Sequence, residues 1–243
     1  MQRPTTLETI PTSRSARHAV IEDARKALAR IILGKNEQIA LALACLLARG
    51  HLLIEDLPGL GKTMLAQALS RTLGLSYSRV QFSSDLLPAD IIGVSVFRQD
   101  SGAFDFVAGP VFAQLVLADE VNRATPTAQR ALLEAMDENQ VSVDGSTREL
   151  PTPFFVVATQ NPGDQIGTFP LPESQLDRFL MRVEIGYPNE ESERELIAGE
   201  DRREMLRDIE AVTGPETLVE LQAAVRKVPV TDALVSYVQA CLL

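Results

Sequence analysis

The sequence lacks tryptophan, and its only two cysteines, Cys45 and Cys241, lie almost a chain length apart in 243 residues. Neither cysteine belongs to a CxxC pair or has a histidine close to it in sequence. This spacing argues against a disulfide framework and against a zinc site, and it is typical of proteins of the reducing cytosol. We therefore expect a cytoplasmic protein.

Long hydrophobic runs are also missing. The longest, residues 39–48, is about half of the roughly 20 residues that a membrane-spanning helix needs, and Arg49 ends it. The first residues are polar and include two prolines where a secretory signal has its apolar region. We expect no membrane span and no export.

Positive charge is in deficit, because the formal net charge is −10. Such a balance disfavours broad, salt-dependent binding of nucleic acid, although a local basic groove would be compatible with it. The hydrophobic fraction of 45% and the charged fraction of 23% are ordinary for globular proteins, which excludes wholesale disorder. The length suits one large domain, or one and a half ordinary ones.

Apolar runs alternate with helical patterns along most of the chain, which predicts a doubly wound parallel sheet. Strands are expected at residues 51–54, 77–82, 114–118 and 154–159. The last two are continuously apolar, as parallel strands covered on both faces are. Helices are expected at 15–31, at 36–49 between Asn36 as N-cap and Gly50, from the glycine loop to Gly74, and from Thr125-Pro126 onward.

Two segments interrupt the alternation and predict β-hairpins, at residues 94–106 and 141–150. The second contains Asp144-Gly145, which supplies the positive φ angles of a tight turn. From Pro188 the pattern becomes that of a charged helix over 189–212. We therefore divide the chain into a flexible lead (1–14), an α/β domain that binds nucleotide (15–187) and a helical region (188–243).

The glycine loop carries the sharpest chemical signal. Residues 58–63 read Pro-Gly-Leu-Gly-Lys-Thr between a predicted strand and a predicted helix. Glycines let backbone N–H groups surround phosphate, and the helix N-terminus adds a positive dipole end. Lys62 would meet the β and γ oxygens, and Thr63 would reach Mg²⁺. The predicted phosphate-binding residues are Asp56, Leu57, Pro58, Gly59, Leu60, Gly61, Lys62 and Thr63.

A second signal is the pair Asp119-Glu120, which ends an apolar strand. Ligands of doubly wound sheets bind at this edge. Asp119 would hold Mg²⁺, and Glu120 would orient and deprotonate the attacking water. Because acidic pairs at strand ends are common, the functional interpretation of this pair depends largely on the presence of the glycine loop.

Two further residues are candidates for catalysis. Asn161 follows another apolar strand and would hydrogen-bond the γ-phosphate or the attacking water; the alternative is an asparagine that starts a turn before Pro162. Arg178 would lend its guanidinium to the γ-phosphate of a neighbouring subunit. The alternative for Arg178 is a pair with a local carboxylate such as Asp177.

Together these residues resemble an AAA+ ATPase, with a Walker A segment at 58–63, a Walker B pair at Asp119-Glu120, a sensor at Asn161 and a Leu-Asp-Arg-Phe segment at 176–179. The sequences of four segments are similar to those of the MoxR family. These segments are residues 54–59, 85–93, 131–136 and 158–162. The resemblance covers about residues 30–243.

The resemblance implies an enzyme that uses ATP and Mg²⁺ to remodel other proteins. Members usually form hexameric rings, hydrolyse ATP between subunits, and work with a partner that carries a von Willebrand factor A domain, often in the maturation or metallation of protein clients. The two hairpins would be insertions that face the ring pore. Gln81 would restrain the catalytic Glu120, and Arg123 would act across the subunit interface or pair locally.

The resemblance also assigns Ile32, Leu33 and Gly34 to the wall of the adenine pocket, and Asp56 is a usual variant of the family's loop. The family's lid normally carries a sensor 2 arginine after a helix like residues 235–242, whereas this sequence stops at Leu243. Either the sequence is a fragment or the protein lacks a complete lid, and over residues 188–243 we expect a helical lid that is only partial.

Two other functions remain open at the level of sequence. A switch that binds nucleotide and recruits a partner with little turnover is slightly favoured by the partial lid. A nucleic-acid motor is disfavoured by the acidic balance and by the lack of a basic patch with aromatic residues.

Overall fold

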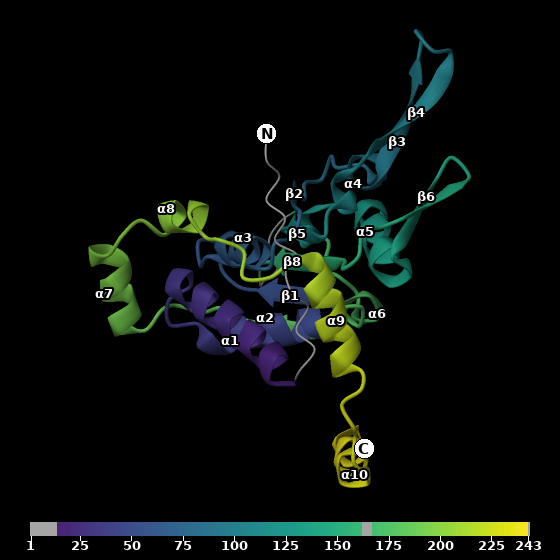
Figure 1. Cartoon of the computed structure of the whole chain (residues 1–243). Helices are drawn as coiled ribbons and strands as arrows, with labels where there is room; N and C mark the ends of the chain where they lie inside the picture. The colour runs from purple at the N-terminus through teal and green to yellow at the C-terminus, as the bar shows by residue number, and fades with distance from the viewer. Residues whose placement is uncertain (1–13, 162–166, 243) are drawn as a thin grey trace, which may run out of the picture.

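A computed structural model describes residues 14–161 and 167–242 (Figure 1). The predicted lead therefore lies outside the described residues except for Arg14. The centre of the fold is a five-stranded parallel sheet in the order β2-β5-β8-β1-β9. Its strands are β1 (Leu52–Glu55), β2 (Tyr77–Gln81), β5 (Leu115–Asp119), β8 (Phe155–Gln160) and β9 (Met181–Val183).

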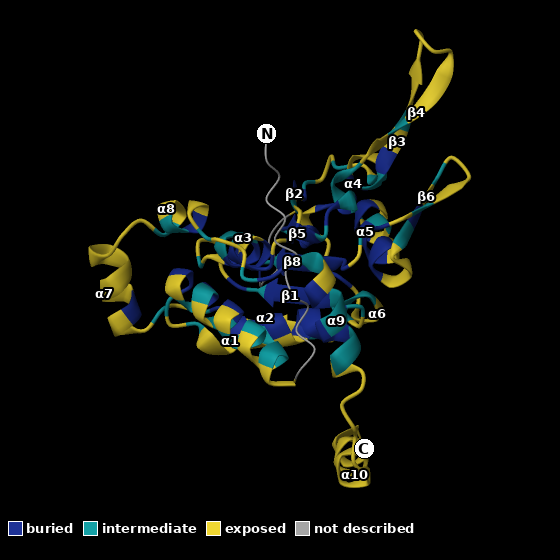
Figure 2. Ribbon diagram, in the orientation of Figure 1, coloured by how far each residue is buried: buried dark blue, intermediate teal, exposed yellow. Residues whose placement is uncertain are grey.

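Alternate residues of the central strands enter two different hydrophobic cores. Leu115 and Leu117 pack in one core, and Val116 and Ala118 pack in the other. The first core is shared with α1 (Arg14–Ile31), α2 (Asn36–Leu47) and α3 (Lys62–Thr72), and the second with α4 (Pro88–Ile92) and α5 (Pro126–Glu138). Figure 2 shows the resulting buried strands between helical layers. The predicted doubly wound parallel sheet is confirmed.

The predicted limits of α2 need correction. Asn36 is the first helical residue and Lys35 is the N-cap, without a side-chain cap hydrogen bond. At the other end Arg49, rather than Gly50, adopts a positive φ of 61°. Gly50 is needed for a different reason, because a Cβ atom there would lie 2.3 Å from the Cβ of Leu180.

Both predicted hairpins are present. β3 (Gly93–Arg98) pairs with β4 (Ala103–Ala108), and β6 (Gln140–Val143) pairs with β7 (Ser146–Glu149). They project from the sheet toward the same side of the molecule (Figure 1). The guanidinium of Arg148 lies 3.8 Å from the ring centroid of Phe106, so the two hairpins touch at their bases.

The predicted charged helix over 189–212 is wrong as a single helix. It is divided into α7 (Glu190–Ala198) and α8 (Arg202–Arg207). The break follows from two local features: Gly199 ends α7, and the side chain of Asp201 accepts a hydrogen bond from the Arg203 N–H and so starts a new helix.

The remaining helices are α6 (Glu173–Leu176), α9 (Pro215–Val225) and α10 (Asp232–Leu242), with short 3₁₀ turns at Pro110–Phe112 and Val121–Arg123. α9 packs on α2, where Gln222 Nε2 donates a 2.8 Å hydrogen bond to the Leu46 carbonyl. All described residues of α10 are exposed (Figure 2). Within the described ranges, no helix is long and apolar enough to cross a bilayer.

His51 lies just before β1 and links α5 to β8 from a buried position. Its Nδ1 accepts a 3.0 Å hydrogen bond from the Val156 N–H, and its Nε2 lies 3.3 Å from the Met136 carbonyl oxygen. The imidazole is therefore neutral, with its proton on Nε2. Burial lowers the pKa of His51 to about 4, against weaker opposing effects of Met136 and Asp137.

This low pKa predicts a loss of stability in mild acid. Below pH 6.5 His51 becomes protonated in the unfolded chain but stays neutral in the folded protein, so the unfolding free energy falls by about 3 kcal/mol between pH 6.5 and 4. Urea unfolding at several pH values measures this loss. The His51→Gln variant should lose that part of the pH dependence; an equal slope in both proteins would contradict the assignment.

Candidate functional site

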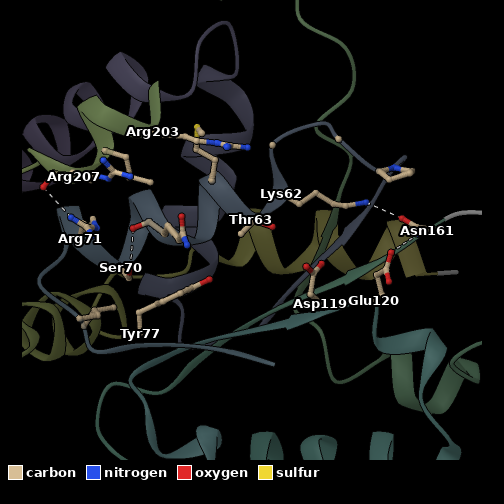
Figure 3. A pocket seen from close by; sticks show the side chains of 17 residues that line it. Lys62, Thr63, Ser70, Arg71, Tyr77, Asp119, Glu120, Asn161, Arg203 and Arg207 are labelled. Carbon is tan, nitrogen blue, oxygen red and sulfur yellow. Dashed lines mark hydrogen bonds between the residues drawn. The ribbon is translucent and has the colours of Figure 1, made fainter. Parts of the chain in front are cut away.

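The carboxyl ends of the central strands border a cavity of about 900 Å³ (Figure 3). This volume is within the range of small-molecule and cofactor sites, and its place at the strand ends is where ligands of such sheets bind. Its lining combines the glycine loop and α3 with the start of β2, the carboxyl ends of β5 and β8, and α8. The lining residues are Pro58, Gly59, Gly61, Lys62, Thr63, Met64, Gln67, Ser70, Arg71, Leu75, Tyr77, Asp119, Glu120, Asn161, Arg203, Leu206 and Arg207.

The glycine loop has a backbone conformation that favours glycine at two positions. Gly59 and Gly61 both have a φ of 89°, a region that other residues rarely adopt. No atom lies within 4 Å of a Cβ built on either glycine, so the conformation alone selects glycine here. α3 begins directly afterwards at Lys62, and the N–H groups of its first turn have no partner within the helix.

Lys62 is buried, and its ammonium group is directed across the loop. Nζ donates hydrogen bonds to the carbonyl oxygen of Asp56, to that of Leu57 at 3.2 Å, and to Asn161 Oδ1 at 3.2 Å. Burial lowers the pKa of Lys62, while Asp56, Asp119 and Glu120 act in the opposite direction. The cation is thus surrounded by acceptors, in a position to exchange some of them for phosphate oxygens.

Asp56 uses its side chain to hold the loop. Oδ1 accepts a 2.8 Å hydrogen bond from the Leu57 N–H, and Oδ2 accepts one of 2.6 Å from the Gly186 N–H. The carboxylate therefore ties the start of the loop to the segment after β9. A direct contact of Asp56 with nucleotide stays a prediction.

Asp119 has both carboxylate oxygens engaged. Thr159 of β8 donates a 2.6 Å hydrogen bond from its hydroxyl to Oδ1, and Arg79 of β2 donates one of 2.6 Å to Oδ2. The Thr159 oxygen also accepts a 2.9 Å hydrogen bond from the Glu120 N–H. Thr159 is fully buried and fixes the backbone and side chain of the acidic pair together.

Glu120 is held by three donors at the end of β5. Oε1 accepts a 3.2 Å hydrogen bond from Asn161 Nδ2, and Oε2 accepts one of 2.9 Å from Gln81 Nε2. Arg123 Nε lies 3.1 Å from Oε2, so Arg123 pairs locally in this single chain. Glu120 itself has a φ of 58°, which is uncommon for a non-glycine residue and typical of functional positions.

Four predicted site residues lie apart from this group. Arg178 is paired with Asp137 of α5 and donates a 3.1 Å hydrogen bond to the Leu133 carbonyl. Its predicted local partner Asp177 is therefore replaced by Asp137. Residues 32–34 follow α1 and do not line the cavity; a Cβ at Gly34 would lie 2.3 Å from Ser192 Oγ of α7. Their contact with adenine stays a prediction, as does the action of Arg178 on another subunit.

Sequence reasoning missed Arg79 and Thr159. Only the sheet register places both residues beside the acidic pair. Arg79 lies opposite Leu117, and Ala158, which precedes Thr159, lies opposite Ala118, which precedes Asp119. The visible signal was a polar side chain near the end of each strand next to β5.

The oxygen donors at the cavity fit a magnesium ion better than a softer metal. Thr63 and Asp119 line the same cavity, and Mg²⁺ prefers oxygen ligands, of which a protein commonly supplies one or two beside phosphate and water. Within residues 14–161 and 167–242, no group of three or more His, Cys, Asp or Glu residues is placed to hold a metal by itself.

Comparison with known proteins shows to which family this chain belongs. Residues 51–181 match the ATPase family associated with various cellular activities (AAA). Chaperone MoxR1 of Mycobacterium tuberculosis is 48% identical over 69% of this chain and 45% of its own length. The protein MoxR of Paracoccus denitrificans is 37% identical over 76% of this chain and 56% of its own. The chain belongs to the MoxR family of AAA+ ATPases.

Other similar proteins extend over nearly all of this MoxR-family chain. YeaC of Bacillus subtilis, an uncharacterized protein, is 43% identical over 91% of the chain and 69% of its own length. A crystal structure from Cytophaga hutchinsonii, named as a candidate ATPase, superposes with a TM-score of 0.81 at 35% identity, covering 92% of this chain and 68% of that one. The chain thus spans 45–69% of the length of the three curated relatives, and it has the AAA+ α/β fold.

Proposed function

We propose that this MoxR-family protein binds ATP with Mg²⁺ and hydrolyses it to ADP and phosphate. The observation that carries the proposal is a continuous hydrogen-bonded line from Lys62 through Asn161 to Glu120 at the rim of one cavity. Because an ammonium group only donates, Asn161 Oδ1 faces Lys62 and Nδ2 faces Glu120. A phosphate sensor and a carboxylate base are thereby connected.

Each residue then has a distinct task. The loop N–H groups and Lys62 bind the β- and γ-phosphates, and Thr63 and Asp119 hold the metal. When bound, Mg²⁺ neutralises charge that develops on the phosphate oxygens. Asn161 orients the attacking water, and Glu120 accepts its proton once the carboxylate leaves its resting donors.

The wider role is also a proposal. We place the protein in a homo-oligomeric ring, hexameric as in its family, in which Arg178 of one subunit approaches the γ-phosphate of the next. The chaperone name of one relative supports action on protein clients. We propose that hydrolysis remodels such clients during maturation or metal insertion, with a partner that carries a von Willebrand factor A domain. The two unpaired cysteines support a cytoplasmic location.

Lys62→Ala tests the binding step. The variant should lose ATP binding, since it removes the ammonium group that follows the glycine loop, and it should lose phosphate release with it. Isothermal titration with ATP and steady-state phosphate release, each with Mg²⁺ or with EDTA, measure both. Lys227→Ala, at an exposed lysine just after α9, is the matched control.

The same measurements separate the other functions. ATP binding without phosphate release, even at high protein concentration with a partner present, would contradict hydrolysis and support a nucleotide-dependent switch. Phosphate release that rises strongly with DNA, together with salt-sensitive DNA binding, would contradict the protein client and support a nucleic-acid motor.

A further inference from the structure

Arg79 joins the two catalytic carboxylates, although neither sequence motif includes it. A single guanidinium NH₂ group of Arg79 donates a 2.6 Å hydrogen bond to Asp119 Oδ2 and a 2.9 Å hydrogen bond to Gln81 Oε1. Gln81 in turn donates a 2.9 Å hydrogen bond to Glu120 Oε2. The result is a line of contacts from the metal-binding carboxylate to the base.

The chemistry of the side chains determines which atom donates and which accepts in each of these hydrogen bonds. Arginine has only donors, so the oxygen of the Gln81 amide must face Arg79. The amide nitrogen then has to face Glu120, and it can only donate to the carboxylate. Arg79 therefore fixes the orientation of the Gln81 amide, and Gln81 in that orientation restrains Glu120.

The sheet register explains why these side chains meet. Gln81 lies beside Asp119 on the neighbouring strand, and Arg79 lies two residues earlier on the same face of β2. Val80, between them, is buried in the core on the opposite face. Arg79 thus reaches along the surface of the sheet to a carboxylate whose side chain is only 11% exposed.

A metal ion and Arg79 would compete for Asp119. Thr159 already occupies one side of Oδ1, and Arg79 occupies Oδ2 with a full positive charge. A cation that approaches the carboxylate meets both the guanidinium and its hydrogen bond. Binding of the metal therefore weakens the contact between Arg79 and Asp119.

We propose that Arg79 is a positioning residue that makes release of Glu120 depend on metal binding at Asp119. In the metal-free state Arg79 holds Asp119 and Gln81 together, and Gln81 holds Glu120. When Asp119 turns to the metal, Arg79 loses its main anchor, Gln81 loses its fixed orientation, and Glu120 becomes free to act as a base. The inference rests on the proposed function, because it assumes that Asp119 binds Mg²⁺ with ATP.

The first test measures the metal directly. Mn²⁺ binding to the full chain in the presence of a non-hydrolysable ATP analogue is followed by electron paramagnetic resonance. Arg79→Met removes the charge at similar length and should tighten Mn²⁺ binding roughly threefold to tenfold, the effect of one partly exposed ion pair. Arg79→Lys keeps the charge and should stay within about twofold of wild type.

The second test separates metal dependence from turnover. The Mg²⁺ concentration for half-maximal phosphate release should fall in Arg79→Met by the same factor, while kcat at saturating Mg²⁺ changes less than about threefold. A merely structural role for Arg79 would lower kcat and leave the Mg²⁺ dependence unmoved. Arg226→Met, at an exposed position after α9, should change neither quantity.

A double-mutant cycle tests the part played by Gln81. Since Gln81 helps to aim Arg79, Gln81→Met should tighten Mn²⁺ binding roughly twofold, and the double variant should match Arg79→Met alone. Additive effects would overturn the link through Gln81. Unchanged or weaker Mn²⁺ binding in Arg79→Met would overturn the competition, while normal wild-type hydrolysis would leave the proposed function intact. A wild-type protein that binds no Mn²⁺ with nucleotide would overturn both.

Discussion

Replacing Glu120 with glutamine is expected to leave ATP binding intact and to lower turnover by about 10²- to 10⁴-fold, the usual contribution of a general base. Glutamine has nearly the shape of glutamate, and Glu120 lies beyond Lys62 and Asn161 at the rim of the cavity. The variant therefore keeps the phosphate-binding loop but cannot accept a proton from water. ATP titration and single-turnover phosphate release measure the two effects separately.

The matched control is Glu210→Gln, at an exposed position between α8 and α9. It makes the same chemical change without touching the cavity and should retain wild-type turnover. If Glu120→Gln hydrolyses ATP as fast as the control, Glu120 is not the base. If it loses binding as well, the carboxylate serves mainly to hold Asn161 and the loop in place.

The sheet was predictable because its signal is local. Residues 115–118 and 154–158 are apolar at every position, a pattern typical of parallel strands covered on both faces. The helical region was less predictable, because the charged pattern of 189–212 continues through the break at Gly199. There the decisive feature is a single cap at Asp201, which contributes little to any periodicity.

The site was predictable where residues adjacent in sequence act together. Lys62, Thr63, Asp119 and Glu120 belong to short motifs, and the structure brings them to one cavity. Thr159 and Arg79 act on Asp119 from 40 residues away, across neighbouring strands. Their contacts with Asp119 depend on the strand register. The alternation of side chains along a strand predicts this register only once the strand order is known.

Arg178→Ala is expected to lower ATP hydrolysis by about 10³-fold or more, as loss of an arginine finger does in related chemistry. In the single chain Arg178 lies outside the cavity that holds Lys62 and is paired with Asp137. It therefore cannot reach the γ-phosphate of its own subunit without leaving that partner. ATP binding, which depends on the loop of the same subunit, should remain unchanged.

Mixing two inactive variants tests whether Arg178 acts between subunits. Arg178→Ala contributes an intact loop, and Lys62→Ala contributes an intact Arg178, so an interface between the two restores one complete site. Phosphate release should reappear in the mixture in proportion to such interfaces, and Arg226→Ala should behave as wild type throughout. Mixed oligomers that form, as size-exclusion chromatography with tagged subunits can establish, but stay inactive would contradict a shared site. Arg178 would then act through its pair with Asp137, by holding the segment after α6 against α5 within each subunit.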